Sequence, residues 1–380
     1  MDKLPEQVIR AFAPNIREKI EKAMAGEIDK CKCIVKRGIG IKSDKRSTDV
    51  KRHIEIEEIR LRVNKPLILN SMGEDYFYDT ETEKLSMRSD SAYIVTKDDI
   101  AKTFQIICKY SIHSFMDDIQ KGFITLDGGH RVGIVGKTIM EGGKVKNMKH
   151  ISSLNIRVSR EVRGCADKVL GDIVAGPNEV NNTIIISPPQ CGKTTILRDI
   201  VRNLSNGNAR FGFSGIKVSL IDERNEIAGT YLGVPQMDVG MRTDVIDSCP
   251  KDIGISMLLR SMSPNVIVTD EIGSEREIES LYNALNGGVS LITTVHGNSI
   301  EDIRNRKELS RLIDSELFKK AIVLSSKKGP GTVEGIYDLE EKEYLNKEKY
   351  ISKEGEKLEL QCNGEIKSIC GEGELVCKSR

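Results

Sequence analysis

The sequence has no long apolar run and no large excess of one charge. None of its apolar stretches approaches the ~18 residues of a membrane-spanning helix, so we expect no transmembrane segment. The N-terminus, MDKLPEQVIRAF, is not a secretory signal peptide, and we therefore expect a cytoplasmic protein. The formal net charge is +1 although 30% of the residues are charged, which argues against a surface committed as a whole to nucleic acid.

Regularly spaced cysteines are also missing. The nine cysteines are an odd number and stand singly or in irregular groups, so we expect free thiols in a reducing compartment. Cys362, Cys370 and Cys377 lie near the C-terminus without C-x-x-C spacing or a nearby histidine. This arrangement favours an unpaired, mobile tail over a metal site.

A chain of 380 residues can form two domains, and the residue patterns indicate two. For residues 1–165 they predict a smaller α+β domain. Its expected elements are an N-terminal helix interrupted at Pro14, a strand pair over 56–69, a helix over 100–110 and a hairpin over 122–139. Residues 166–182 are expected to be a linker.

Two segments are expected to lie outside these domains. Residues 30–52 are basic and have few large apolar side chains, which favours a flexible insertion. The alternative is a patch for an anionic membrane surface or for nucleic acid. Residues 345–380 are rich in Lys, Glu and Gly and are expected to be a flexible tail.

Residues 183–344 alternate short apolar strands with helices. This alternation predicts an α/β domain with a mostly parallel sheet and its ligand at the carboxyl ends of the strands. The expected strands are 184–186, 218–223, 266–271, 289–295 and 321–326. The expected helices are one that carries the apolar positions from Ile196 to Leu204, one around 255–262 and one over 275–285.

The segment TIIISPPQCGKTTILRDIVRNL carries the most specific pattern in the chain. Ile184–Ile186 predict a buried strand, and an amphipathic helix that stops at Gly207 follows Gly192. A strand, loop and helix N-terminus of this kind bind polyphosphate through backbone amides. Lys193 is expected to reach the β- and γ-phosphates, and Thr194 to bind Mg²⁺. The expected nucleotide-binding residues are Ser187, Pro188, Pro189, Gln190, Cys191, Gly192, Lys193, Thr194 and Thr195.

Acidic residues follow two other strands of this domain. VIVTDE ends in Asp270 and Glu271, which we interpret as a Mg²⁺ ligand and a group that activates the attacking water. LIDERNE adds Asp222, Glu223 and Glu226, on a strand expected to lie near the phosphate-binding one. Glu223 or Glu226 is a candidate to share the water-activating role, and the alternative is a solvated loop.

His296 stands at the end of another strand, on the edge of the sheet where the ligand is expected. This position favours sensing of the γ-phosphate over a purely structural role. Neutralising phosphate charge also requires arginines. The candidates are Arg157, Arg224, Arg242 and Arg260. His130 has no metal partner in the sequence and is interpreted as a turn or interface residue.

These patterns together resemble the core of the type II/IV secretion ATPases. In that superfamily an arginine-bearing helix is followed by an acidic strand and then by a His box. The same order occurs here in MLLRSMSPNVIVTDEIG and SLITTVHGNS. Within it, the chain more closely resembles the family of stage III sporulation protein AA, through EEIRLRVNKPLIL, GFITLDGGHRVGIVG, SPPQCGKTTILRD and IDERNEIAGTYLGVPQMDVGMRTDV. In that family Ser187 is normal where other phosphate loops have a first glycine, whereas Gln190 stands where a glycine is expected.

The resemblance implies a RecA-like P-loop ATPase with ATP and Mg²⁺ as its ligands. It assigns catalysis to Lys193, Glu271, Glu223, His296 and Arg157, and metal binding to Thr194 and Asp270. Arg157 corresponds to the N-domain arginine that reaches the nucleotide in secretion ATPases.

The resemblance also implies partners. These are further copies of the chain in a ring, expected to be a hexamer, and integral channel proteins between mother cell and forespore, approached from the mother-cell side. Two other classes of protein stay open. One is a P-loop motor or regulator that acts on nucleic acid, although we do not expect nucleic acid as a partner. The other is a nucleotide-gated assembly factor with little turnover.

Overall fold

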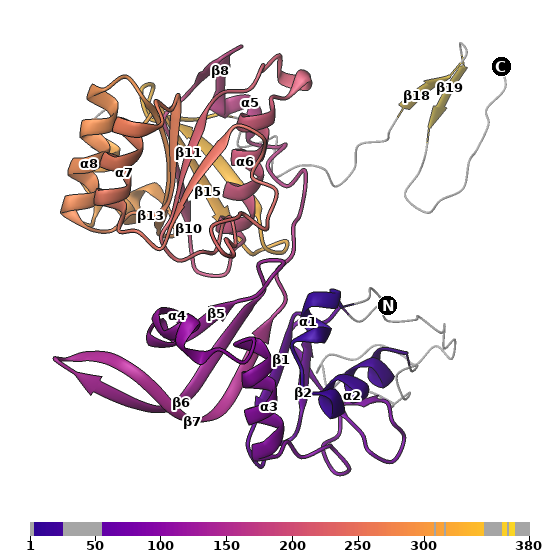
Figure 1. The fold of residues 1–380 in the computed structure, drawn as a ribbon. Coiled ribbons are helices and arrows are strands. Elements are labelled where there is room, and N and C mark those ends of the chain that lie inside the picture. Colours follow the sequence, from indigo (N-terminus) through magenta and orange to yellow (C-terminus); the bar gives the residue numbers. More distant parts are fainter. Residues whose placement is uncertain are drawn as a thin grey trace. The chain divides into compact units, whose positions relative to one another are not determined.

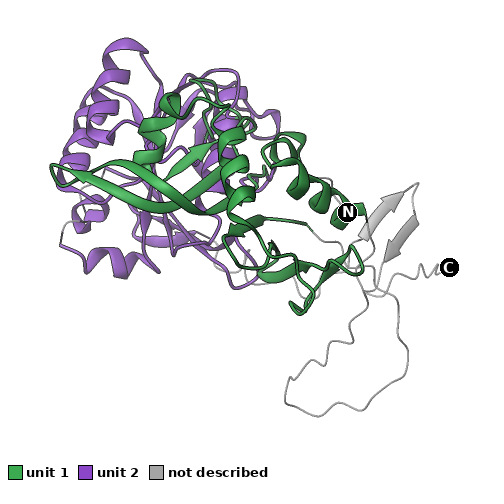
Figure 2. Ribbon diagram, turned by 60° about the horizontal axis from the view of Figure 1, so that its bottom comes forward, with its two compact units in different colours: residues 1–161, 228–238 green, residues 162–227, 239–380 purple. Residues whose placement is uncertain are grey.

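The computed structural model describes residues 4–25, 55–307, 309–314, 317–345, 359–362 and 365–368. The chain divides into two compact units, Met1–Glu161 with Ala228–Asp238, and Val162–Ile227 with Val239–Arg380 (Figure 2). The segment Ala228–Asp238 therefore packs with the N-terminal unit although the residues on both sides of it belong to the second. The basic stretch 30–52 and the side chains of Cys362, Cys370 and Cys377 lie outside what the structure describes.

The N-terminal unit is an antiparallel sheet with helices. Its strand order is β4-β3-β2-β1-β7-β6-β5. The strands are β1 (Glu58–Arg62), β2 (Ile68–Ser71), β3 (Glu74–Tyr78), β4 (Leu85–Ser86), β5 (Phe123–Thr125), β6 (Arg131–Glu141) and β7 (Lys144–Arg157). The helices are α1 (Glu6–Arg10), α2 (Pro14–Ala25), α3 (Lys97–Ile107), the 3₁₀ helix η1 (Ile112–Phe115) and α4 (Met116–Lys121).

Local sequence explains these elements. β1 alternates half-buried and buried residues, as expected for a strand with one face on a core. Pro14 starts α2, where its missing N–H costs nothing, and this separates α2 from α1 as predicted. Thr96 and Asp99 form a capping box that starts α3. The predicted strand pair and hairpin are confirmed as β1–β2 and β5–β6.

The second unit contains an eight-stranded sheet in the order β12-β11-β13-β14-β10-β15-β16-β17. The strands are β10 (Thr183–Ser187), β11 (Val218–Asp222), β12 (Thr243–Asp247), β13 (Val266–Glu271), β14 (Ser290–His296), β15 (Lys320–Ser325), β16 (Thr332–Asp338) and β17 (Glu343–Leu345). The helices are α5 (Leu170–Ile173), α6 (Lys193–Asn206), the 3₁₀ helix η2 (Ala209–Phe211), α7 (Lys251–Ser261), α8 (Glu275–Asn286), α9 (Ile300–Arg304) and α10 (Ser310–Asp314). Two strand pairs stand apart, β8 (Val174–Gly176) with β9 (Glu179–Val180), and β18 (Glu359–Cys362) with β19 (Glu365–Ser368).

The strand pairs from β12 to β15 are all parallel, and β16 runs antiparallel to both of its neighbours, β15 and β17. Figure 1 shows α6 on one face and α7 with α8 on the other. The predicted mostly parallel α/β domain, preceded by a smaller α+β domain, is confirmed. The sequence did not predict β12, whose residues are all half-buried and carry no apolar run.

The order of the strands locates the ligand edge. From β10 the chain crosses to β11, returns through β13 and β14, and then passes to β15 on the other side of β10. Such a switch point places a ligand at the carboxyl end of β10. β11, which was expected to lie near β10, belongs to the same sheet, with β13 and β14 between the two strands.

Candidate functional site

The phosphate loop connects the fully buried strand β10 to α6. Ser187 is buried at the end of the strand, while Pro189 and Gln190 are exposed in the middle of the loop. Gly192 precedes α6 without a side chain to cap it, and the first turn of α6 has no acidic residue. The amides at this helix N-terminus are therefore suited to an anion.

Gly192 is required both by its own backbone and by a neighbouring loop. Its φ is 78°, and a Cβ at this position would lie 2.8 Å from the backbone nitrogen of Gly331. Gly331 belongs to the loop between β15 and β16, and its N–H donates a hydrogen bond of 2.8 Å to the carbonyl oxygen of Cys191. A side chain at position 192 would force these two loops apart.

Glu271, the last residue of β13, faces three basic side chains. Its Oε2 lies 3.4 Å from Lys193 Nζ, 3.1 Å from His296 Nε2 and 3.9 Å from Arg224 Nη1. The β13–β14 pairing shifts register between Val268 and Glu271, and such a bulge turns a side chain away from the regular alternation. The structure thus brings the phosphate-loop lysine, the acidic strand and the His box to one point.

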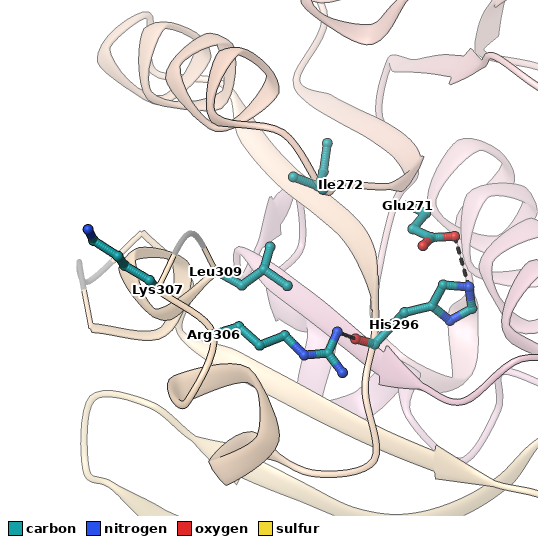
Figure 3. Close-up of a pocket in the computed structure, with 7 residues that line it drawn as sticks. Glu271, Ile272, His296, Arg306, Lys307 and Leu309 are labelled. Carbon is teal, nitrogen blue, oxygen red and sulfur yellow. Dashed lines mark hydrogen bonds and ion pairs between the residues drawn. The ribbon is translucent and has the colours of Figure 1, made fainter.

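His296 links Glu271 to the phosphate-binding strand. It lies opposite Ser187 in the parallel register of β14 with β10. Its Nδ1 is 3.3 Å from the carbonyl oxygen of Ser187, while Nε2 faces Glu271 (Figure 3). Both neighbours are hydrogen-bond acceptors, and a ring nitrogen of His296 donates to its neighbour when it carries a proton.

A pocket of about 390 Å³ opens beside this pair. Its lining residues are Glu271, Ile272, Gly273, His296, Arg306, Lys307 and Leu309 (Figure 3). Arg306 donates a hydrogen bond of 2.8 Å from Nη1 to the carbonyl oxygen of His296, and its Nη2 lies 3.0 Å from Asp302 Oδ2. The sequence did not single out Arg306, because it follows α9 outside any recognisable pattern.

Asp270 lies next to Glu271 but in different surroundings. Lys251 Nζ lies 3.0 Å from Asp270 Oδ1 and 3.4 Å from Glu277 Oε1, and it also pairs with Glu223. Burial raises the pKa of Asp270 to about 6; the positive charge of Lys251 opposes this shift, and Asp222 and Glu223 add to it. Burial lowers the pKa of Lys251, but Glu223 and Asp270 outweigh that effect and the pKa is raised overall.

The sequence missed Lys251 entirely. It is the first residue of α7 and follows β12, the strand without an apolar run. The one available signal was a lysine at a helix start, where an acidic residue is usual.

The acidic loop after β11 divides its carboxylates between two tasks. Asp222 is buried, and its two carboxylate oxygens accept hydrogen bonds from the N–H groups of Glu226 (2.9 Å) and Ile227 (3.0 Å). It therefore shapes the loop, which Arg198 also holds by donating to the carbonyl oxygen of Glu226 at 2.7 Å. Glu223 is the acid of this loop that pairs with Lys251.

The four candidate arginines lie in different places. Arg224 is at the site but its side chain is 63% exposed. Arg242 donates a hydrogen bond of 2.7 Å to the carbonyl oxygen of Ser205 near the end of α6, and Arg260 is exposed on α7. Arg157 belongs to the other unit, as the last residue of β7, and its role at the nucleotide remains a prediction.

The residues present fit a nucleotide with Mg²⁺. The loop offers amides and an ammonium group to phosphates, and Thr194 and Asp270 offer oxygen ligands. In the described part of the chain no three His, Cys, Asp or Glu residues form a metal cage. Mg²⁺ needs no such cage, because it commonly takes one or two protein oxygens together with phosphates and water.

The fold and the site define the class: a RecA-like P-loop domain that follows a smaller α+β unit. The chain belongs to the family described as sporulation stage III, protein AA, which matches residues 34–344. It is 41% identical over 285 residues to stage III sporulation protein AA of Bacillus subtilis (strain 168), covering 75% of this chain and 87% of that protein. The expected family is thereby confirmed.

Solved structures of ATPases are similar to this chain at low identity. The Legionella pneumophila ATPase DotB has a TM-score of 0.46 at 14% identity, covering 85% of this chain and 78% of that chain. The pilus retraction motor PilT with bound ADP has a TM-score of 0.46 at 14% identity, covering 71% of this chain and 74% of that chain.

Among the described helices, none combines the length and the apolar character that crossing a bilayer requires. The four cysteines whose side chains are described, Cys108, Cys165, Cys191 and Cys249, are free thiols.

Proposed function

We propose that this protein hydrolyses ATP with Mg²⁺ and uses the cycle to energise assembly of, or transport through, a secretion-like channel between mother cell and forespore. The observation that carries the ATPase proposal is the position of Glu271, within 3.9 Å of Arg224, 3.4 Å of Lys193 and 3.1 Å of His296 at the phosphate-loop edge of the sheet. Membership in the sporulation stage III family supports the cellular role.

The residues would divide the work as follows. The amides of the phosphate loop and Lys193 bind the phosphates, and Thr194 and Asp270 hold Mg²⁺. When bound, Mg²⁺ draws charge from the phosphate oxygens and makes the γ-phosphorus more open to attack. Glu271 takes a proton from the attacking water, and Glu223 is the second candidate for this role. His296 contacts both Ser187 and Glu271, so it can report the state of the γ-phosphate to the strand.

Replacing the proposed base tests the ATPase proposal. We expect Glu271→Gln to bind ATP about as well as the unaltered protein and to hydrolyse it at least about 100-fold more slowly, because general-base catalysis contributes factors of this size. The measurements are phosphate release and binding of a fluorescent ATP analogue. Glu279→Gln, an exposed change on α8, is the matched control and should keep full activity. Unchanged hydrolysis by the Glu271 variant would remove this residue from the mechanism.

The cellular proposal has its own test. Affinity purification of the Glu271→Gln protein from sporulating cells, with ATP present, should also recover integral channel proteins. A motor that binds ATP without hydrolysing it is expected to remain bound to the complex on which it acts. Recovery of nucleic acid without such proteins would contradict the channel proposal and favour a motor that acts on nucleic acid.

A further inference from the structure

We propose that Lys251 is a positioning residue of the nucleotide site. Its ammonium group would act as an internal counter-ion that holds Asp270 and Glu223 in place and keeps divalent cations off them until a nucleotide binds. The inference rests on the proposed function, because only a site that receives Mg²⁺ with its substrate needs its carboxylates kept free of metal beforehand.

Lys251 joins three carboxylates from three separate elements. Glu223 comes from the loop after β11, Asp270 from the end of β13, and Glu277 from the first turn of α8. The Lys251 side chain is 5% exposed. A lysine this deeply buried is rare unless it is paired, and removing one partner of a buried ion pair leaves an uncompensated charge.

The three carboxylates depend on Lys251 to different degrees. Glu277 Oε2 also accepts hydrogen bonds from the N–H groups of Gly273 (3.0 Å) and Ser274 (2.7 Å), so the start of α8 stabilises it independently. Asp270 Oδ1 is buried, and Lys251 Nζ, 3.0 Å away, is the one group that compensates its charge within the described residues. Asp270 is therefore the residue that loses most when Lys251 is replaced.

The same contacts fix the segment that carries the proposed base. Lys251 contacts Asp270 directly before Glu271, and it contacts Glu277 six residues further on, where α8 begins. Glu271 is thus held between two points that share one ammonium group. Without that group, three neighbouring carboxylates repel one another, and a divalent cation becomes the available counter-ion.

Metal binding without nucleotide tests this inference. We expect nucleotide-free Lys251→Met protein to bind Mn²⁺ about ten-fold or more tightly than the unaltered protein, because a like charge a few ångströms from the metal has been removed. Added Mn²⁺ or Mg²⁺ should also raise its Tm, since a ligand that binds only the folded state stabilises it. Electron paramagnetic resonance of free Mn²⁺ and thermal unfolding measure the two effects.

Two variants separate a counter-ion from a packing role. Lys251→Arg keeps the positive charge and should bind Mn²⁺ as weakly as the unaltered protein. If Lys251 acted through packing alone, Mn²⁺ affinity would not depend on whether residue 251 is charged. Lys217→Met, which removes an exposed lysine of the same unit, should change neither readout. Mn²⁺ affinities of the Lys251→Met and unaltered proteins within about two-fold of each other would overturn the proposal.

The test remains decisive if Lys251→Met does not fold. Lys251→Met combined with Glu277→Gln removes the carboxylate that α8 already stabilises, and it leaves Asp270 and Glu223 without their counter-ion, so the same gain in Mn²⁺ affinity is expected. The readout needs no ATP. If the unaltered protein releases no phosphate from ATP, the ATPase proposal fails. If the Mn²⁺ titration shows no gain in affinity on replacing Lys251, the Lys251 proposal fails.

Discussion

Gln190 holds a left-handed backbone conformation in the middle of the phosphate loop, with φ at 60°. This is the position at which the family resemblance leads one to expect glycine. Left-handed backbone costs an ordinary L-residue about 1–2 kcal/mol, and a glycine adopts it without that penalty. The Gln190 side chain is exposed and does not pack in the core. The energetic cost of having glutamine here instead of glycine therefore comes from the backbone conformation.

This conformation predicts opposite outcomes for two substitutions. Gln190→Val should lower the free energy of unfolding by about 1–2 kcal/mol, because a β-branched residue is the least tolerant of a positive φ. Gln190→Gly should leave it within about 0.5 kcal/mol of the original, because the relief of strain is offset by a more flexible unfolded chain. Urea unfolding measures both, and equal losses from the two changes would show that the left-handed conformation is not maintained in solution.

At the scale of elements, the turn between β5 and β6 connects two distant parts of the N-terminal unit. His130 is buried, and its Nδ1 accepts a hydrogen bond of 3.1 Å from the N–H of Ser159 after β7. The N–H of Gly128 donates a hydrogen bond of 2.9 Å to Gln236 Oε1, in the segment Ala228–Asp238. The turn therefore fixes both the end of β7 and the segment that follows the acidic loop, which agrees with the interpretation of His130 as a turn residue.

Burial lowers the pKa of His130, with Asp127 opposing the shift, and this gives a pH dependence of known sign. The folded state then binds fewer protons than the unfolded state, so stability is complete above the unfolded pKa of about 6.5 and declines as the pH falls below it. His130→Gln, which keeps an acceptor for Ser159, should reduce this decline between about pH 6.5 and 5. Unfolding followed across that range is the measurement, and exposed His113→Gln should leave the decline unchanged.

At the scale of the whole molecule, the chain passes between its two units three times, at Glu161–Val162, Ile227–Ala228 and Asp238–Val239. The middle crossing follows directly on the loop that Asp222 shapes and Arg198 holds. The acidic loop is therefore joined to the N-terminal unit by the peptide bond between Ile227 and Ala228. Under the proposed function, this bond is a covalent route by which a change at the nucleotide would reach the other unit.

Self-association is the prediction that belongs to this scale. We expect Glu271→Gln with ATP and Mg²⁺ to form a closed ring of about six copies of the 42.3 kDa chain, because the resemblance to secretion ATPases implies a hexamer. Light scattering after size exclusion measures the mass. Lys193→Ala, which removes the phosphate-binding ammonium group, should stay at the lower mass. A mass that does not respond to ATP in either protein would exclude a nucleotide-dependent ring.

The sequence by itself determined the phosphate loop, the acidic strand end and the His box, since each is a short run of neighbouring residues next to a strongly apolar strand. It predicted the parallel sheet for the same reason. It did not predict β12, whose residues are all half-buried, and it therefore missed Lys251 just beyond it. Arg306 was missed because no local pattern marks it.

Only the tertiary structure decided which of these residues meet. Lys251, Glu223, Asp270 and Glu277 are far apart in the chain, and they share a site because β11, β13 and the starts of α7 and α8 meet at one edge of the sheet. The assignment of Ala228–Asp238 to the N-terminal unit is likewise a matter of packing. Local periodicity determines elements, whereas the pairing of buried charges depends on the strand order, and no short stretch of sequence encodes that order.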